Sequence, residues 1–151
     1  MKRVSIALLA ALLALAALVG ALAEGVELET VMASFGLGEE MMALTEEDLT
    51  DVYGIDPADV GQFAAAIHDS GIKADEIVLV QAVDEEAAGR VQAALEGRFQ
   101  DKLNELEGYL PEEYAVAAAC KVEADGLFVA MIVSPDAEAL TGLWQEAIAA
   151  K

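Results

Sequence analysis

The sequence predicts an α+β domain: a four-stranded, largely antiparallel sheet with helices packed on one face. Residues 77–83 form a nearly unbroken run of β-branched and apolar side chains, which is typical of a buried strand. Residues 85–108 and 140–148 instead carry apolar side chains at helical spacing. Each half of the chain reads as strand, strand, helix, and residues 74–76 resemble residues 124–126 at the same point of each half. This parallel suggests a duplicated strand-strand-helix unit.

The first 23 residues have the features of a cleavable secretory signal peptide. Lys2 and Arg3 form a positive start, residues 4–19 are almost wholly apolar, and Ala-Leu-Ala at 21–23 fits a cleavage site. The apolar stretch is also long enough for an uncleaved membrane anchor, but its alanine content and the cleavage site favour removal. We therefore expect a secreted or extracytoplasmic protein with no membrane span after cleavage.

Length and charge narrow the classes of function. The chain has 151 residues and a formal net charge of −20, with 28 acidic residues that all follow residue 23. This charge repels nucleic acid and anionic membranes and favours cations or basic partners, although a solvated surface needs no partner at all. The expected organisation is a signal peptide at 1–23, an N-terminal helix and linker at 24–44, and one α+β domain at 45–151.

The N-terminal part predicts two short helices. Residues 26–35 have apolar positions three and four apart, and Gly36 ends the segment. Met41 and Met42 form either an adaptable binding surface or, as we expect, a buried patch under the linker. Residues 45–48 (Thr-Glu-Glu-Asp) predict a capping box that starts the second helix.

The middle of the chain predicts two strands and the longest helix. Residues 60–68 suit either a helix or a strand, and the turn signal at 69–71 favours a strand. The continuous apolar run at 77–83 implies a strand covered on both faces or central in the sheet. Asp84 caps a helix over residues 85–108. Its apolar stripe consists of Val91, Leu95, Phe99, Leu103 and Leu106. Its cations, which we place off that stripe, are Arg90, Arg98 and Lys102.

The C-terminal part predicts a β-hairpin and a helix. Residues 114–122 and 127–133 are apolar enough for two strands, and Ala-Asp-Gly at 124–126 predicts the turn between them. Ser134 then has the type of an N-cap and Pro135 that of the first helical position.

Four short motifs occur in a fixed order. The first is Leu49 followed by Tyr53-Gly54-Ile55-Asp56, and the second is Ala74-Asp75-Glu76-Ile77. The third is Asp84 with a long helix that contains Arg98. The fourth is Tyr109-Leu110-Pro111-Glu112 before a hairpin that ends in Ser134-Pro135-Asp136. Over residues 45–148 this order resembles a family of small exported bacterial proteins, mainly from Gram-positive anaerobes, known as a domain of unknown function. Many members look like lipoproteins, with a cysteine after the leader. Residues 21–25 contain no cysteine, which argues against a lipid anchor here. The resemblance implies an exported protein of this fold and no particular activity.

One group of residues is a weak candidate for contact with a ligand or partner. Arg98, Tyr109 and Tyr114 flank the loop between the long helix and the predicted hairpin. Because cations are scarce, an arginine beside tyrosines could hold a carboxylate of a ligand or partner. The structural alternative is that Arg98 pairs with a glutamate of its own helix while the tyrosines close the end of the core.

Catalytic and metal sites find little support. His68 and Cys120 are the only residues of their types, so zinc lacks ligands and a Cys–His pair would depend on their meeting in space. The lone cysteine also excludes an intramolecular disulfide. The aspartates near residue 50 lack the spacing of a calcium loop, and the glycines at 36 and 38 lack the rest of a phosphate-binding motif. We therefore predict no catalytic residue, no metal and no cofactor.

These observations favour a non-enzymatic exported module that binds a partner protein or an envelope component. One alternative is an unrecognised carboxylate-based hydrolase that acts on cell-envelope material, which would need a pocket with two carboxyl groups of raised pKa. Another is acidic buffering of cations at the cell surface, which would follow from the charge alone.

Overall fold

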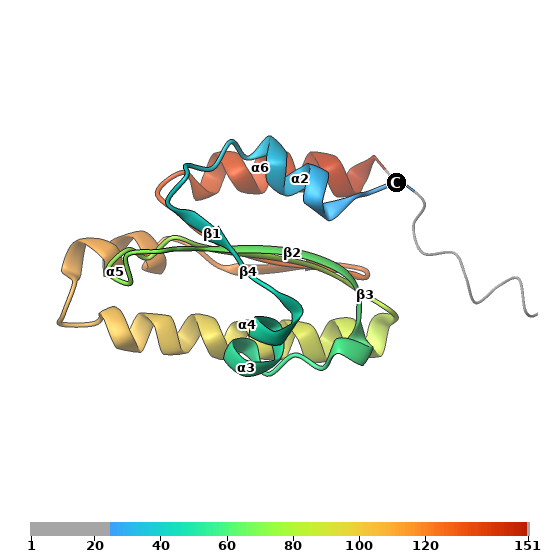
Figure 1. Ribbon diagram of the computed structural model, residues 1–151, viewed down its shortest axis with the longest axis horizontal. Coiled ribbons are helices and arrows are strands. Elements are labelled where there is room, and N and C mark those ends of the chain that lie inside the picture. The colour runs from blue at the N-terminus through green and yellow to red at the C-terminus, as the bar shows by residue number, and fades with distance from the viewer. Residues whose placement is uncertain (1–24, 151) are drawn as a thin grey trace, which may run out of the picture.

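A five-stranded antiparallel sheet organises residues 25–150, the part of the chain that the computed structural model describes (Figure 1). The predicted signal peptide lies outside these residues. The strands are β1 (Met41–Ala43), β2 (Val60–His68), β3 (Glu76–Ala82), β4 (Val122–Asp125) and β5 (Phe128–Val133), in the spatial order β1-β2-β3-β5-β4. The helices are α2 (Leu28–Ser34), α3 (Glu46–Tyr53), α4 (Glu85–Leu106), α5 (Pro111–Ala118) and α6 (Ala137–Ala149), with a 3-10 turn, η1, at Pro57–Asp59. The predicted α+β class with an antiparallel sheet is confirmed.

The helices lie on both faces of the sheet, so the prediction that they share one face is wrong (Figure 1). Every residue of β3 and β5 is buried, and alternate side chains of these strands point to opposite faces. Val78 and Val80 belong to the core under α4, whereas Ile77 and Leu79 belong to the core under α2 and α6. Because both faces of the central strands are apolar, each face needs a layer of helices.

The fifth strand comes from a segment that we predicted as a linker. The β1 strand adds to the free side of β2, with Met42 facing Ile67 across the ladder. Three residues are too few for an alternating pattern to be visible in the sequence. The α2 helix packs on β2 and β3, and Gln62 of β2 holds its entry, since Gln62 accepts a hydrogen bond from Leu28 N (3.0 Å) and donates one to Val26 O (2.7 Å). The N-terminal helix is therefore packed on the domain.

The strand predicted at residues 114–122 is wrong in most of its length. Pro111 occupies the first turn of α5, Glu112 and Glu113 follow it there, and the helix continues to Ala118. Proline at the start, acidic residues in the first turn and several alanines all favour a helix. Only Val122 of the predicted strand belongs to β4. The apolar content of the segment therefore reflects a short helix covering the core.

The predicted helix starts agree with the structure for α3 and α4, where Asp84 is the N-cap, and differ for α6. The capping box of α3 is confirmed, since Thr45 and Asp48 exchange side-chain to backbone hydrogen bonds. The start of α6 is later than predicted. Ser134 Oγ accepts a hydrogen bond from Asp136 N (3.2 Å) in a turn, Asp136 is the N-cap, and the helix begins at Ala137. Each half of the chain does contain two strands followed by a helix, but α4 and α6 lie on opposite faces.

Candidate functional site

The corner between α4 and α5 presents the most exposed aromatic side chain among the described residues. Gly108, with φ of 74°, turns the chain after α4, and Pro111 starts α5. A positive φ is open to glycine at little cost, so this residue allows the abrupt change of direction. Tyr109 stands between these two residues with 74% of its surface exposed. The local sequence therefore holds an aromatic ring away from the core.

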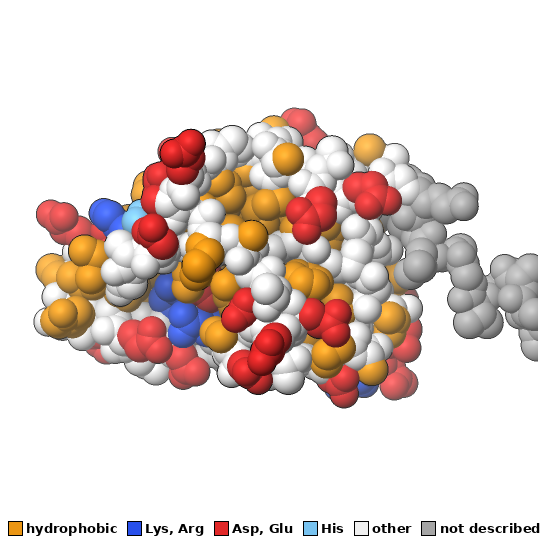
Figure 2. Space-filling model, in the orientation of Figure 1, with side chains coloured by type: hydrophobic (Ala, Val, Ile, Leu, Met, Phe, Trp, Pro, Cys, Tyr) orange, Lys and Arg blue, Asp and Glu red, His pale blue; other side chains and the backbone are white. Residues whose placement is uncertain are grey.

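An apolar hollow of about 300 Å³ begins at the residue that follows this tyrosine in the chain, Leu110. It is lined by Ile72, Lys73, Leu110, Pro111, Glu112 and Glu113. Ile72, in the loop between β2 and β3, is itself 57% exposed. On the face drawn in Figure 2, hydrophobic side chains gather at this end of the molecule (left). We call Ile72, Tyr109, Leu110 and Pro111 the corner patch.

One ion pair fixes the shape of the corner patch. Glu113 of α5 accepts a hydrogen bond from Lys73 Nζ (2.7 Å) and a second from the backbone N–H of Ala74 (2.8 Å). These hydrogen bonds, together with the charge of Lys73, lower the pKa of the Glu113 carboxyl. The carboxylate thus joins the start of α5 to the β2–β3 loop, and it holds the two apolar sides of the hollow in place.

A buried charge cluster lies at a second place, between α3, β3 and α4. Glu76 is fully buried and accepts hydrogen bonds from Arg98 Nε (3.0 Å) and Arg98 Nη2 (2.9 Å). Lys102 Nζ lies 2.8 Å from its Oε2 atom, and Tyr53 Oη donates to its Oε1 atom at 2.8 Å. One carboxylate therefore joins three elements of the fold.

The electrostatics of the buried charge cluster keep Glu76 ionised. Burial alone would raise the pKa of this carboxyl, but the hydrogen bonds from Arg98 and the charge of Lys102 outweigh it and lower the pKa. Burial and the neighbouring Glu76 carboxylate raise the pKa of Tyr53. Each carboxylate oxygen of Glu76 already has two donors, so the cluster is suited to hold the fold together.

The structure separates the three residues that the sequence singled out. The guanidinium of Arg98 bonds Glu76 and also lies 3.4 Å from Glu105 of its own helix, so carboxylates of this chain occupy it. Tyr114 lies partly buried in α5 against the core under α4. Tyr109 stands exposed in the corner patch. The arginine therefore contributes to the buried charge cluster and Tyr109 to the surface.

The sequence reasoning missed Glu76, Lys102 and Tyr53. Lys102 is buried together with Leu95 and Leu106 of the apolar stripe, so the prediction that it lies off that stripe is wrong. Two features of the sequence accompany the cluster, although neither by itself distinguishes a buried carboxylate from a solvated one. Glu76 is the charged first residue of a strand whose other residues, except Gln81, are apolar. Arg98 and Lys102 follow Leu95 at spacings that keep them on its side of the helix.

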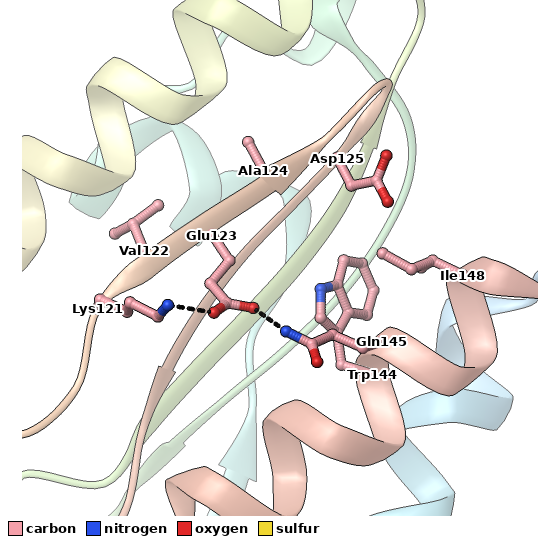
Figure 3. A pocket seen from close by; sticks show the side chains of 8 residues that line it. All are labelled: Lys121, Val122, Glu123, Ala124, Asp125, Trp144, Gln145 and Ile148. Carbon is pink, nitrogen blue, oxygen red and sulfur yellow. Dashed lines mark hydrogen bonds and ion pairs between the residues drawn. The ribbon is translucent and has the colours of Figure 1, made fainter.

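A polar hollow of about 460 Å³ lies between β4 and α6 (Figure 3). Glu123 of β4 pairs with Lys121 (2.8 Å) and accepts a hydrogen bond from Gln145 Nε2 of α6 (3.0 Å). Trp144 lines the hollow but keeps only 1% of its surface exposed, so its ring is packed in the core and cannot stack on a ligand. Both oxygens of Glu123 have partners from this chain, and the bonds connect β4 to α6.

Among residues 25–150, no group of three histidine, cysteine or acidic side chains is placed to hold a metal ion. Cys120 is half-buried and donates towards Val116 O (3.2 Å), and burial raises the pKa of its thiol. His68 lies beside Asp69, with Nδ1 3.4 Å from the carboxylate. The same part of the chain contains no helix with the length and apolar character needed to cross a membrane.

Comparison with known proteins gives one match. The sequence model of a family described as Domain of unknown function (DUF4358) matches residues 33–134. No curated protein and no solved structure matches the chain. The matched range contains the buried charge cluster and the corner patch.

Proposed function

The chain belongs to the DUF4358 family, and we propose that it is an exported, non-enzymatic module that binds a partner protein. The corner patch is the observation that carries this proposal. Ile72 is 57% exposed and lines an apolar hollow of about 300 Å³, and Tyr109, which directly precedes the lining residue Leu110, is 74% exposed. Tyrosines that stand beside a pocket supply much of the binding energy in protein interfaces. Export is proposed from the signal-peptide features of residues 1–23.

The charge of the surface supports a basic partner. Each lysine and arginine in residues 25–150 lies within ion-pair distance of a carboxylate of the same chain. The remaining acidic residues leave a strongly negative surface, and the net charge of the chain is −20. Such a surface attracts partners of positive charge and speeds their encounter.

The pKa shifts support a role without catalysis. General acid catalysis by a carboxyl group at neutral pH requires a raised pKa. In residues 25–150, every carboxyl group whose pKa departs clearly from its ordinary value has a lowered pKa, because each of these groups accepts hydrogen bonds from its neighbours. They are Asp48, Asp59, Glu76, Glu113 and Glu123.

We predict that a photo-crosslinking side chain at Glu112, beside the hollow, captures one specific protein in the native host. Adding Tyr109→Ser and Ile72→Ser should reduce the yield of this adduct by at least about tenfold, because both anchors of the corner patch are then lost. The same substitutions should change the free energy of unfolding by no more than about 0.5 kcal/mol, since both side chains are largely exposed. Gel analysis of the adducts and urea denaturation provide the two measurements.

The control is the same crosslinker at Val52 of α3, an apolar side chain that is 49% exposed and lies outside the corner patch. It should give no adduct of the same size. Equal capture from both positions, or an adduct yield that survives the double substitution, would contradict the proposal.

A further inference from the structure

The outer edge of β1 presents unpaired backbone groups. Glu40 O accepts a hydrogen bond from Asp69 N (2.9 Å), and Leu44 N donates one to Ala65 O (2.9 Å). In an antiparallel ladder the residues alternate, so the backbone groups of Met41 and Ala43 point away from β2. Met41 N donates to Gly38 O (3.1 Å) in the preceding turn. The N–H and C=O of Ala43 and the C=O of Met41 therefore face outwards at the end of the sheet.

An apolar groove of about 330 Å³ runs beside this edge, between α2 and the sheet. Its floor is formed by residues 64–66 of β2. Ala64 and Ala66 turn small side chains towards this face, whereas Ala65 points to the core under α4. Met32 and Met41 line its sides, and methionine side chains adapt to the shape of what they contact. Figure 2 shows hydrophobic side chains gathered between the places that α2 and β1 occupy in Figure 1.

Carboxylates border the groove. Glu29 lines it, and the Glu40 carboxylate lies over Gly38, another lining residue, where a Cβ atom would collide with it. Both glutamates are exposed. A second copy of this chain, with a net charge of −20, would be repelled from this edge. The charges instead complement an occupant that carries lysine or arginine.

We propose that β1 and this groove bind an extended segment of a partner protein in which apolar residues alternate with lysine or arginine. The segment pairs with the outward backbone groups of Met41 and Ala43 as a sixth strand. Alternate side chains of an added strand point to opposite faces, so its apolar residues enter the groove. Its lysine or arginine residues then lie on the other face, where the negative net charge of the chain attracts them. In such strand addition the backbone supplies affinity and the groove supplies specificity. This surface is separate from the corner patch, and the inference does not depend on it.

The test uses a synthetic peptide of about nine residues in which valine and lysine alternate. In NMR titrations of the full protein we expect shifts centred on residues 41–44, with slower exchange of the Ala43 amide. N-methylation of the peptide amides that face β1 should weaken binding by at least about tenfold, because the added hydrogen bonds are lost. N-methylation of the amides on the other edge should leave the affinity unchanged.

Three controls distinguish strand addition from attraction by charge alone. A peptide of the same composition in which the lysines and valines form two blocks should bind at least about tenfold more weakly. Ala43→Pro removes the outward N–H and should have the same effect, since proline is tolerated where an edge N–H faces solvent. The Tyr109→Ser, Ile72→Ser protein should bind the peptide as the unmodified chain does. Equal binding of the block or methylated peptides, or no shifts at residues 41–44, would overturn the proposal.

Discussion

Replacing Glu76 by glutamine is expected to lower the free energy of unfolding by about 3–5 kcal/mol. Glutamine fills the same space but has no charge, so Arg98 and Lys102 would lose the carboxylate that balances their positive charges. Their side chains are only 15% and 6% exposed, and water can replace little of the lost interaction. Removing one partner of a buried ion cluster lowers the free energy of unfolding by more than the whole cluster contributes to it, because the remaining charges stay buried without compensation. Urea denaturation at neutral pH measures the change.

Two further variants test whether the burial of the cluster causes the loss of stability in Glu76→Gln. Glu105 also pairs with Arg98, at 3.4 Å, but its side chain is 64% exposed, so Glu105→Gln should cost no more than about 1 kcal/mol. Replacing the whole cluster by Glu76→Leu, Arg98→Met and Lys102→Met should restore stability to within about 1 kcal/mol of the unmodified chain or above it. A triple variant as unstable as Glu76→Gln would show that this explanation is wrong.

Acid should reduce the difference between the unmodified chain and the Glu76→Gln variant. The folded protein lowers the pKa of Glu76 below its ordinary value of 4.5. A carboxyl group with a lowered folded pKa contributes stability that is fully present above its unfolded pKa and is lost as pH falls through the folded pKa. The two proteins should therefore differ most at neutral pH and converge well below pH 4.5. A difference that stays constant with pH would mean that the charge of Glu76 contributes nothing.

Replacing Trp144 by alanine is expected to cost about 3–5 kcal/mol. The indole is 1% exposed and meets Phe128 of β5 edge to face, with ring centroids 6.0 Å apart and planes at 76°. It fills the core between α6 and the sheet, and its removal leaves a cavity that the surrounding strands cannot close. Denaturation in urea reports this loss, and a large fall in the midpoint with an unchanged slope is the expected form.

The neighbouring residue gives a matched control. Leu143 is on the same helix but is 40% exposed, so Leu143→Ala should cost no more than about 1 kcal/mol. Both substitutions place alanine, the residue of highest helix propensity, in α6, so helix propensity destabilises neither variant. If the two variants were equally unstable, the effect would not come from the packed ring.

The predictable part of the fold is the part that local patterns encode. The continuous apolar run of β3 and the capping box of α3 depend on neighbouring residues, and both were predicted correctly. β1 was missed because its three residues form a strand only through pairing with β2. The apolar residues of α5 were read as a strand, although Pro111 and the acidic residues after it gave the opposite signal. The elements that the sequence did not predict correctly were therefore a strand that depends on long-range pairing and a short helix.

The candidate site was predictable only in part for a similar reason. Tyr109 could be placed in the loop after the long helix, but the sequence left open whether its ring closes the end of the core or stands on the surface, as it does in the structure. The partner of Arg98 could not be identified from the sequence. It is Glu76, which lies on a different element, β3, and meets the arginine only when the chain folds. A carboxylate at a strand end has the same sequence signal whether it is solvated or buried. Its role follows from the packing of α3, β3 and α4, which no single segment encodes.

The central position of β3 also affects how the chain is made. β3 pairs with β2, which precedes it, and with β5, which follows only after α4, α5 and β4. During synthesis, one side of β3 therefore lacks its neighbour until β5 has left the ribosome. Neither core can close before then, because β5 contributes side chains to both. A nascent chain that stays open until its last strand arrives is suited to passage through a secretion channel, as the proposed export requires.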